Sequence, residues 1–263
     1  MDLGIADKRA LVLAGGGGLG GASARALAAE GVVVAVADYS KDAAQAVADE
    51  IIAAGGRATP FFCDLASLDS IRDLHDAVVT GIGNPDILVN VTGGPPQAQA
   101  EGTDPAQWTG FFDSMVRSVI FATDLVLPAM KAAGFGRIIT SSSSGVVAPI
   151  PDLAISNALR LALLGWSKTL SKEVARDGIT ANVVIPGRIA TKRVASLDQA
   201  RADAQPGRAL EDVVSASTST IPIGRYGTVD EFAALVAFVA GAPASYITGS
   251  ALRVDGGLLA NVI

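Results

Sequence analysis

Cysteine and histidine are almost missing from the sequence, which limits the chemistry that it can support. The 263 residues include one cysteine, Cys63, and one histidine, His75. A disulfide within the chain needs two cysteines, and metal centres and nucleophile triads draw on clusters of cysteine or histidine. We therefore expect no internal disulfide and no metal site. We interpret Cys63 as a core residue in a reducing compartment, and His75 as a helix residue away from any ligand.

Charge is also scarce, at 17% of the residues, and acid dominates, with 26 Asp and Glu against 20 Lys and Arg. A net charge of −6 disfavours binding to nucleic-acid phosphates, so nucleic acid is not an expected partner. The chain does not open on a basic start followed by an apolar run, which argues against a signal peptide. The uncharged stretch from 232 to 252 is interrupted by Gly241, Pro243 and Gly249, whereas a membrane span needs about 20 apolar residues. We expect a soluble cytoplasmic protein without a membrane partner.

Hydrophobic residues, in contrast, make up half of the chain. That share excludes a disordered or collagen-like chain, and a chain of this length buries roughly three quarters of its unfolded surface. Short apolar runs without polar alternation, typical of parallel strands covered on both faces, alternate with stretches of helical spacing. The expected strands cover residues 9–14, 32–37, 58–63, 86–91, 137–140, 180–185 and 251–254. The expected helices cover residues 18–30, 41–54, 67–82, 105–133, 156–177 and 230–240.

This rhythm predicts one α/β domain over residues 1–263. We expect a doubly wound Rossmann-type fold, with a mostly parallel seven-stranded sheet and helices on both faces. Between about residues 188 and 227 the pattern weakens and polar residues gather. We interpret that segment as a substrate lid rather than as a second domain.

A run of glycines, Gly15 to Gly21 with Leu19 inside it, follows the first expected strand and opens the first expected helix. At such a turn, glycines let the pyrophosphate of a dinucleotide approach the backbone N–H groups of the helix N-terminus. Two registers of the dinucleotide fingerprint fit the run. They are Gly15/Gly17/Gly20 and Gly16/Gly18/Gly21.

Asp38 ends the second expected strand, 18 residues beyond Gly20. About 20 residues is the spacing at which an acidic side chain accepts hydrogen bonds from the adenosine ribose. A 2′-phosphate would be repelled by this carboxylate, and the glycine run carries no basic residue to offset it. The pattern predicts NAD(H), rather than NADP(H), as cofactor.

With these features in place, the chain resembles the short-chain dehydrogenase/reductase family, and in particular its 3-oxoacyl-(acyl carrier protein) reductase-like members. The resemblance covers nearly the whole length. It rests on Gly18-Leu19-Gly20, Asp64, Asn90-Val91-Thr92-Gly93, Pro186-Gly187-Arg188-Ile189-Ala190-Thr191, Tyr246-Ile247-Thr248-Gly249 and Asp255-Gly256-Gly257. Ala14 stands where the family's first glycine is usual.

The resemblance implies a set of cofactor-binding residues in addition to Asp38. It implies that Asp64 and Leu65 flank the adenine, and that Ile189 and Thr191 hold the nicotinamide carboxamide. The remaining implied residues are Gly15, Gly17, Gly18, Leu19 and Gly20 at the phosphates, and Asn90, Thr92 and Gly93 on the ribose side. The resemblance also implies a homodimer or homotetramer built through the long helices at 105–133 and 156–177.

At the catalytic positions the sequence departs from the family. The family's serine falls on Ser143, its tyrosine thirteen residues later falls on Ser156, and its lysine four residues further falls on Arg160. The family's helix asparagine falls on Met115. The resemblance therefore places an atypical Ser/Ser/Arg set where Ser/Tyr/Lys is usual.

Carbonyl reduction needs a proton for the alkoxide as the hydride arrives, and the family's tyrosine supplies it. Ser156 has no accessible ionisation near neutrality and Arg160 stays protonated, so neither is a conventional acid or base. Arg160 can instead hold the ribose hydroxyls of the nicotinamide or stabilise a developing oxyanion. The four-residue spacing puts Ser156 and Arg160 on one helix face.

Three functions follow, and the sequence leaves them open. The first is an NAD(H)-dependent alcohol dehydrogenase or ketone reductase for a small molecule, with 3-oxoacyl compounds among the candidates, where water relays the proton or Asp152 donates it. The second is a non-redox lyase, isomerase or dehydratase that clamps an anion. The clamp would use Arg160, Arg188, Lys192 and Arg193. The third is a catalytically inactive, cofactor-binding subunit that assembles with an active relative.

Overall fold

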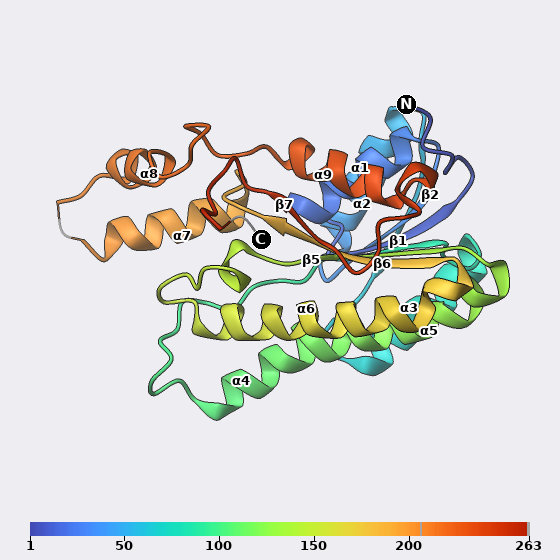
Figure 1. Cartoon of the computed structure of the whole chain (residues 1–263), viewed down its shortest axis with the longest axis horizontal. Coiled ribbons are helices and arrows are strands. Elements are labelled where there is room, and N and C mark those ends of the chain that lie inside the picture. The colour runs from blue at the N-terminus through green and yellow to red at the C-terminus, as the bar shows by residue number, and fades with distance from the viewer. Residues whose placement is uncertain (206, 262–263) are drawn as a thin grey trace.

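The computed structural model describes residues 1–205 and 207–261 and has the doubly wound architecture that the sequence predicts (Figure 1). Seven strands form one sheet in the order β3-β2-β1-β4-β5-β6-β7, and every pairing is parallel. The strand order reverses between β1 and β4, which in such sheets opens a ligand crevice at the carboxyl edge. The strands are β1 (Arg9–Leu13), β2 (Val33–Asp38), β3 (Arg57–Phe62), β4 (Ile87–Asn90), β5 (Gly136–Ser141), β6 (Ile179–Pro186) and β7 (Ala251–Val254).

Helices cover both faces of the sheet (Figure 1). On one face lie α1 (Gly18–Ala29), α2 (Lys41–Ala53) and α9 (Val229–Ala240). On the other lie α3 (Leu68–Gly81), α5 (Ser118–Ala133) and α6 (Ala154–Val174).

Each face has its own hydrophobic core. The core under α1 and α9 includes Leu27, Val36 and Phe232, and the core under α3, α5 and α6 includes Leu74 and Val126. Each such side chain contributes about 1.5–3 kcal/mol when it is fully buried. The two cores therefore make the sheet a rigid support for the loops at its carboxyl edge.

Cys63 lies in the second core with a free thiol and 2% of its surface exposed, as the sequence predicts for a core residue. Burial raises the pKa of this thiol to about 11, because the thiolate would lose its hydration. His75 lies in α3, where it contacts Asp76. Within the described parts of the chain, no helix is long and apolar enough to cross a bilayer.

The helix predicted over residues 105–133 is not continuous. α4 (Pro105–Phe112) passes into a single π-helical turn, Asp113–Arg117, before α5 begins. Met115 lies in that turn with 1% of its surface exposed, in a third apolar cluster that includes Leu163 of α6. Hydrophobic spacing cannot distinguish one wide turn from an ordinary one, so the interruption was not predictable from the pattern.

The segment predicted as a lid contains two helices that the sequence pattern did not indicate, α7 (Lys192–Asp203) and α8 (Leu210–Thr218). Figure 1 shows both at one end of the molecule, away from the sheet. A short loop, residues 187–191, links the carboxyl end of β6 to α7. The lid function of this segment stays a prediction.

Candidate functional site

The glycine turn is packed tightly between β1, β2 and α1. The amide of Gly16 donates to Oδ2 of Asp38 at 2.9 Å, and a Cβ on Gly16 would lie 2.8 Å from Asp38 Cγ. A Cβ on Gly20 would lie 2.1 Å from the carbonyl oxygen of Ala14. Real Cβ atoms do not approach other atoms so closely. Only glycine therefore fits at positions 16 and 20.

The N-terminus of α1 is exposed beside this turn. Gly17 precedes the helix with an extended backbone, and no side chain in the described chain caps the first turn. A Cβ on Gly17 would meet nothing within 4 Å. The uncapped N–H groups and the positive end of the helix dipole suit a pyrophosphate, so Gly17, Gly18, Leu19 and Gly20 fit a dinucleotide.

Asp38 is fixed next to that helix end. Its Oδ2 accepts from Gly16 and its Oδ1 accepts from the amide of Ser40 at 2.9 Å. The side chain is half-buried. Because an ionised carboxylate has about four acceptor positions, two remain for the hydroxyls of a ribose.

Asp64 and Leu65 follow β3 at the same edge of the sheet. The amide of Cys63 donates to the carbonyl oxygen of Asp38 at 2.9 Å, which brings the end of β3 beside the end of β2. Oδ1 of Asp64 accepts from Ala66, and Leu65 is half-buried. The two residues lie where an adenine bound beside Asp38 would reach, and their contact with it stays a prediction.

The three residues expected on the ribose side lie at or just after the end of β4, and they differ in burial. Asn90 is fully buried, and its amide nitrogen lies 3.5 Å from Thr123 Oγ1 and 3.4 Å from Thr140 Oγ1. Asn90 thus ties β4 to α5 and β5, so its effect on a ribose would be through the position of the strand end. Thr92 is buried, whereas Gly93 is exposed at the edge.

The two serines of the predicted catalytic set lie on either side of the loop between β5 and α6. Ser143 is half-buried, and its Oγ accepts from the amide of Gly145 at 3.1 Å, which leaves the hydroxyl proton free to be donated. Ser156 lies in the first turn of α6 with 8% of its surface exposed. Their roles stay predictions.

Arg160 lies one turn after Ser156 on the buried face of α6. Its Nη1 donates to the carbonyl oxygen of Ser141 at 3.3 Å, and its Nη2 donates to those of Thr92 at 3.4 Å and Gly93 at 3.2 Å. These contacts join the carboxyl ends of β4 and β5. Burial lowers the pKa of Arg160 to about 10, with a smaller contribution from a neighbouring positive charge, so the guanidinium remains charged at neutral pH.

Ile189 and Thr191 lie in the loop between β6 and α7. The amide of Ala190 donates to the carbonyl oxygen of Gly227 at 2.8 Å, and Gly227 donates back to Arg188 at 2.9 Å. Ile189 is buried, and Oγ1 of Thr191 accepts from Val194 as the N-cap of α7. These hydrogen bonds fix the loop at the carboxyl edge of the sheet, and the contact of Ile189 and Thr191 with a carboxamide stays a prediction.

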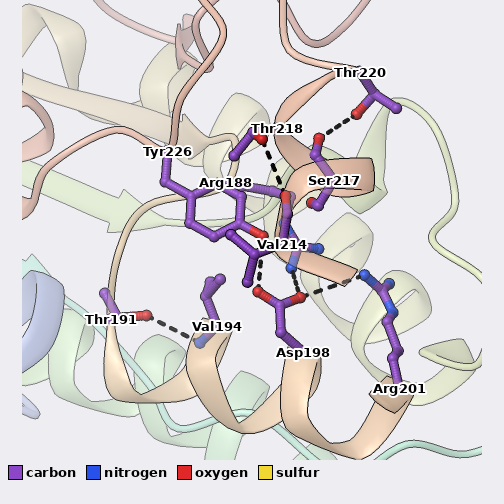
Figure 2. Close-up of polar contacts among 10 residues, drawn as sticks. All are labelled: Arg188, Thr191, Val194, Asp198, Arg201, Val214, Ser217, Thr218, Thr220 and Tyr226. Carbon is purple, nitrogen blue, oxygen red and sulfur yellow. Dashed lines mark hydrogen bonds and ion pairs between the residues drawn. The ribbon is translucent and has the colours of Figure 1, made fainter. Parts of the chain in front are cut away.

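Figure 2 shows a cluster of side chains whose polar contacts no pattern in the sequence predicts. Asp198 of α7 is buried, and its carboxylate accepts from Nη2 of Arg188 and from the hydroxyl of Tyr226 at 2.8 Å. Nη1 of Arg201 lies 3.8 Å from the same carboxylate. Asp198 therefore balances the charge of Arg188, and the place of Arg188 in an anion clamp stays a prediction. Arg188 and Tyr226 lie 10 and 28 residues from Asp198, so no local spacing indicates these two contacts.

A cavity of about 590 Å³ lies beside the turn that follows Ser143. Its wall includes Gly145, Ile150, Trp108 and Leu161, with Asp152 at its edge. Asp152 is exposed and lies on the wall of this cavity, whereas Arg160 occupies the buried face of α6. The structure does not bring Asp152 and Arg160 together by any hydrogen bond or ion pair in the described residues.

Comparison with known proteins shows the family to which the chain belongs. The family model described as enoyl-(acyl carrier protein) reductase matches residues 13–259. The chain belongs to this family of short-chain dehydrogenases/reductases. It is 35% identical over 253 residues to the 3-oxoacyl-(acyl-carrier-protein) reductase FabG of Escherichia coli (strain K12), over 95% of this chain and 97% of that protein. It is 32% identical over 248 residues to the short-chain reductase protein NovJ of Streptomyces niveus, over 94% and 92%.

Solved structures show the same architecture. The L-sorbose reductase of Gluconobacter frateurii, complexed with NADPH and L-sorbose, is similar over 100% of both chains, with a TM-score of 0.94 and 28% identity. The actinorhodin polyketide ketoreductase with NADPH is similar over 96% of this chain and 97% of that one, with a TM-score of 0.91 and 33% identity. The chain is thus an oxidoreductase of the short-chain dehydrogenase/reductase type.

Proposed function

We propose that the protein is an NAD(H)-dependent enzyme that interconverts a carbonyl compound and a secondary alcohol. The observation that carries the choice of NAD(H) is the carboxylate of Asp38, which Gly16 and Ser40 fix beside the N-terminus of α1. That carboxylate accepts from both ribose hydroxyls and repels a 2′-phosphate. Asp64 and Leu65 would flank the adenine, and Ile189 and Thr191 would hold the carboxamide.

The proposed chemistry assigns one task to each polar group of the site. The bound nicotinamide supplies or accepts the hydride. The hydroxyls of Ser143 and Ser156 donate to the substrate's carbonyl oxygen, and the charge of Arg160 stabilises the negative charge that develops there. Because neither hydroxyl ionises near neutrality, a chain of water molecules relays the proton to that oxygen.

The first experiment is a fluorescence titration of the purified protein with NADH and, separately, with NADPH. We expect the wild type to prefer NADH, and Asp38→Ala to weaken NADH binding about tenfold, as the loss of charged hydrogen bonds does, while NADPH binding improves. Asp73→Ala, which removes an exposed carboxylate from α3, is the matched control and leaves both affinities unchanged. A wild type that prefers NADPH would contradict the assignment of NAD(H).

The second experiment measures ketone reduction by the absorbance of NADH. Loss of one group that stabilises an oxyanion costs about 100-fold in kcat, and we expect that loss for Arg160→Ala. Arg160→Lys keeps a positive charge, so its kcat should lie between those of Arg160→Ala and the wild type. Unchanged turnover and cofactor affinity in Arg160→Ala would remove Arg160 from both of its proposed roles.

Tight NADH binding without turnover of any ketone would favour a cofactor-binding subunit, and turnover without a change in absorbance would favour a non-redox enzyme.

We further propose that the protein forms a homodimer or homotetramer through α4 and α6. Phe112 is 41% exposed and Leu161 is 50% exposed, and both lie on these helices. Large apolar side chains that stay exposed on one copy of a chain are typical of an interface between subunits.

A further inference from the structure

Two arginines from different helices contact one short loop at the carboxyl edge. Arg160 of α6 donates to the carbonyl oxygens of Thr92 and Gly93, and Nη2 of Arg193 of α7 donates to the carbonyl oxygen of Pro95. Arg193 also covers Gly94, since a Cβ there would lie 3.4 Å from its Nε and Nη2 atoms. The two guanidinium groups thus contact the loop that follows β4, at the edge where the substrate is expected.

The charge of this pair is not balanced by the chain. Neither Arg160 nor Arg193 forms an ion pair with a carboxylate in residues 1–205 and 207–261, unlike Arg188, which Asp198 neutralises. Burial lowers the pKa of both guanidinium groups, and the charge of Arg193 contributes to the lowered pKa of Arg160. Arg160 is buried without an acidic partner, whereas buried charges are ordinarily paired. Arg193 beside it is exposed, so a ligand can reach it, and the two neighbouring positive charges favour an anion there.

The start of α7 adds to the same field. Arg193 is the second residue of this helix, and Thr191 caps it, so the positive end of the helix dipole lies beside the guanidinium. The same helix start lies near the glycine turn, because a Cβ on Gly18 would be 3.9 Å from Cγ2 of Thr191. An anion held by Arg193 would therefore lie between the cofactor turn and the loop after β4.

We propose that Arg193, with the fixed charge of Arg160 behind it, binds a carboxylate of the substrate, so that the carbonyl compound is an oxo acid rather than a neutral ketone. This inference rests on the proposed function, whose site it completes. A guanidinium binds a carboxylate through two parallel hydrogen bonds, which orients the substrate as well as attracting it. Arg193 is then the residue that determines specificity, and Arg160 keeps its place at the carbonyl oxygen.

The test compares an acid with its neutral ester when no turnover can occur. Protein loaded with NAD⁺ is titrated calorimetrically with acetoacetate and with methyl acetoacetate, neither of which NAD⁺ can reduce. We expect acetoacetate to bind the wild type at least about tenfold more tightly than the ester, the effect of a charged hydrogen bond, and to weaken with added salt. Arg193→Ala should remove this difference, and Arg193→Lys should keep part of it.

Lys172→Ala is the matched control, because it removes one positive charge from an exposed position in the last turn of α6. It should leave both affinities unchanged. The inference is overturned if the wild type does not bind acetoacetate, if it does not prefer the acid, or if Arg193→Ala retains the preference. An equal loss of NADH affinity in Arg193→Ala would place Arg193 on the cofactor phosphates and would also overturn it.

Failure of the proposed function looks different. If the wild type binds no nicotinamide cofactor but cofactor-free protein still binds acetoacetate through Arg193, the anion site stands and the redox function falls. If NADH reduces the ester as efficiently as the acid, the redox function stands and the inferred substrate class falls.

Discussion

At the scale of single residues, Ala14 has an unusual backbone conformation at the end of β1. Its φ of 47° lies in the left-handed region, which a residue with a Cβ disfavours. The position is also the one at which the family resemblance expects a glycine. The turn therefore keeps the conformation of a glycine while it carries a methyl group.

This conformation predicts that Ala14→Gly stabilises the protein. Relief of the left-handed strain exceeds the entropy that a glycine adds to the unfolded chain, so the free energy of unfolding should rise by about 0.5–1 kcal/mol. Urea denaturation followed by circular dichroism measures the change. Ala46→Gly, at an exposed position inside α2, is the control and should lower the free energy of unfolding by about 1 kcal/mol. A loss of stability in Ala14→Gly would show that the strain is absent.

At the scale of elements, Asp198 fastens α7 to the rest of the molecule. Its carboxylate is held by Arg188 from the loop after β6 and by Tyr226 from the segment before α9 (Figure 2). The loop after β6 contains Ile189 and Thr191, which are expected to hold the nicotinamide, and α7 follows that loop. The position of α7, and of Arg193 on it, therefore depends on one buried carboxylate.

Asp198→Asn keeps the shape of the side chain and removes its charge, which leaves Arg188 without its partner. Breaking a buried ion pair costs about 3–5 kcal/mol, and we expect most of that loss to appear as local opening of α7. Hydrogen exchange should show faster exchange of the α7 amides, with β1 and β4 unchanged. Asp203→Asn, on the exposed part of the same helix, should leave the exchange as it is. Equal protection of α7 in wild type and Asp198→Asn would contradict this role.

At the scale of the whole molecule, the exposed apolar side chains of Phe112 on α4 and Leu161 on α6 predict assembly. Native mass spectrometry of the wild type should show a dimer or tetramer, and Leu161→Arg should shift it to smaller species, because a charge at an apolar interface loses its hydration. Leu210→Arg is the control, since Leu210 is also partly exposed but lies on α8. A wild type that is monomeric at micromolar concentration would contradict the proposed oligomer.

A feature of this structure is predictable from the sequence when the residues that form it are close together along the chain. The strands were predictable because each apolar run carries its own signal, as in the buried stretch Val34 to Ala37. The glycine turn and Asp38 were predictable because their spacing is local and fixed by the ligand. α7 was not predicted, because its partners lie far along the chain and its sequence is polar. The sequence predicts Arg193 as one of four cations of an anion clamp, but not its contact with Pro95, which spans 98 residues.

The strand order also determines when, during translation, the carboxyl edge of the sheet is complete. β1, the glycine turn and β2 leave the ribosome first. The other neighbour of β1 in the sheet, β4, is made later. Arg193, in α7, is made later still. At the usual 5–20 residues per second, about 8–30 seconds separate the emergence of Asp38 from that of Arg193. A nascent chain therefore presents half of a nucleotide site, with an unpaired strand beside it, before the half that would retain a substrate has been made.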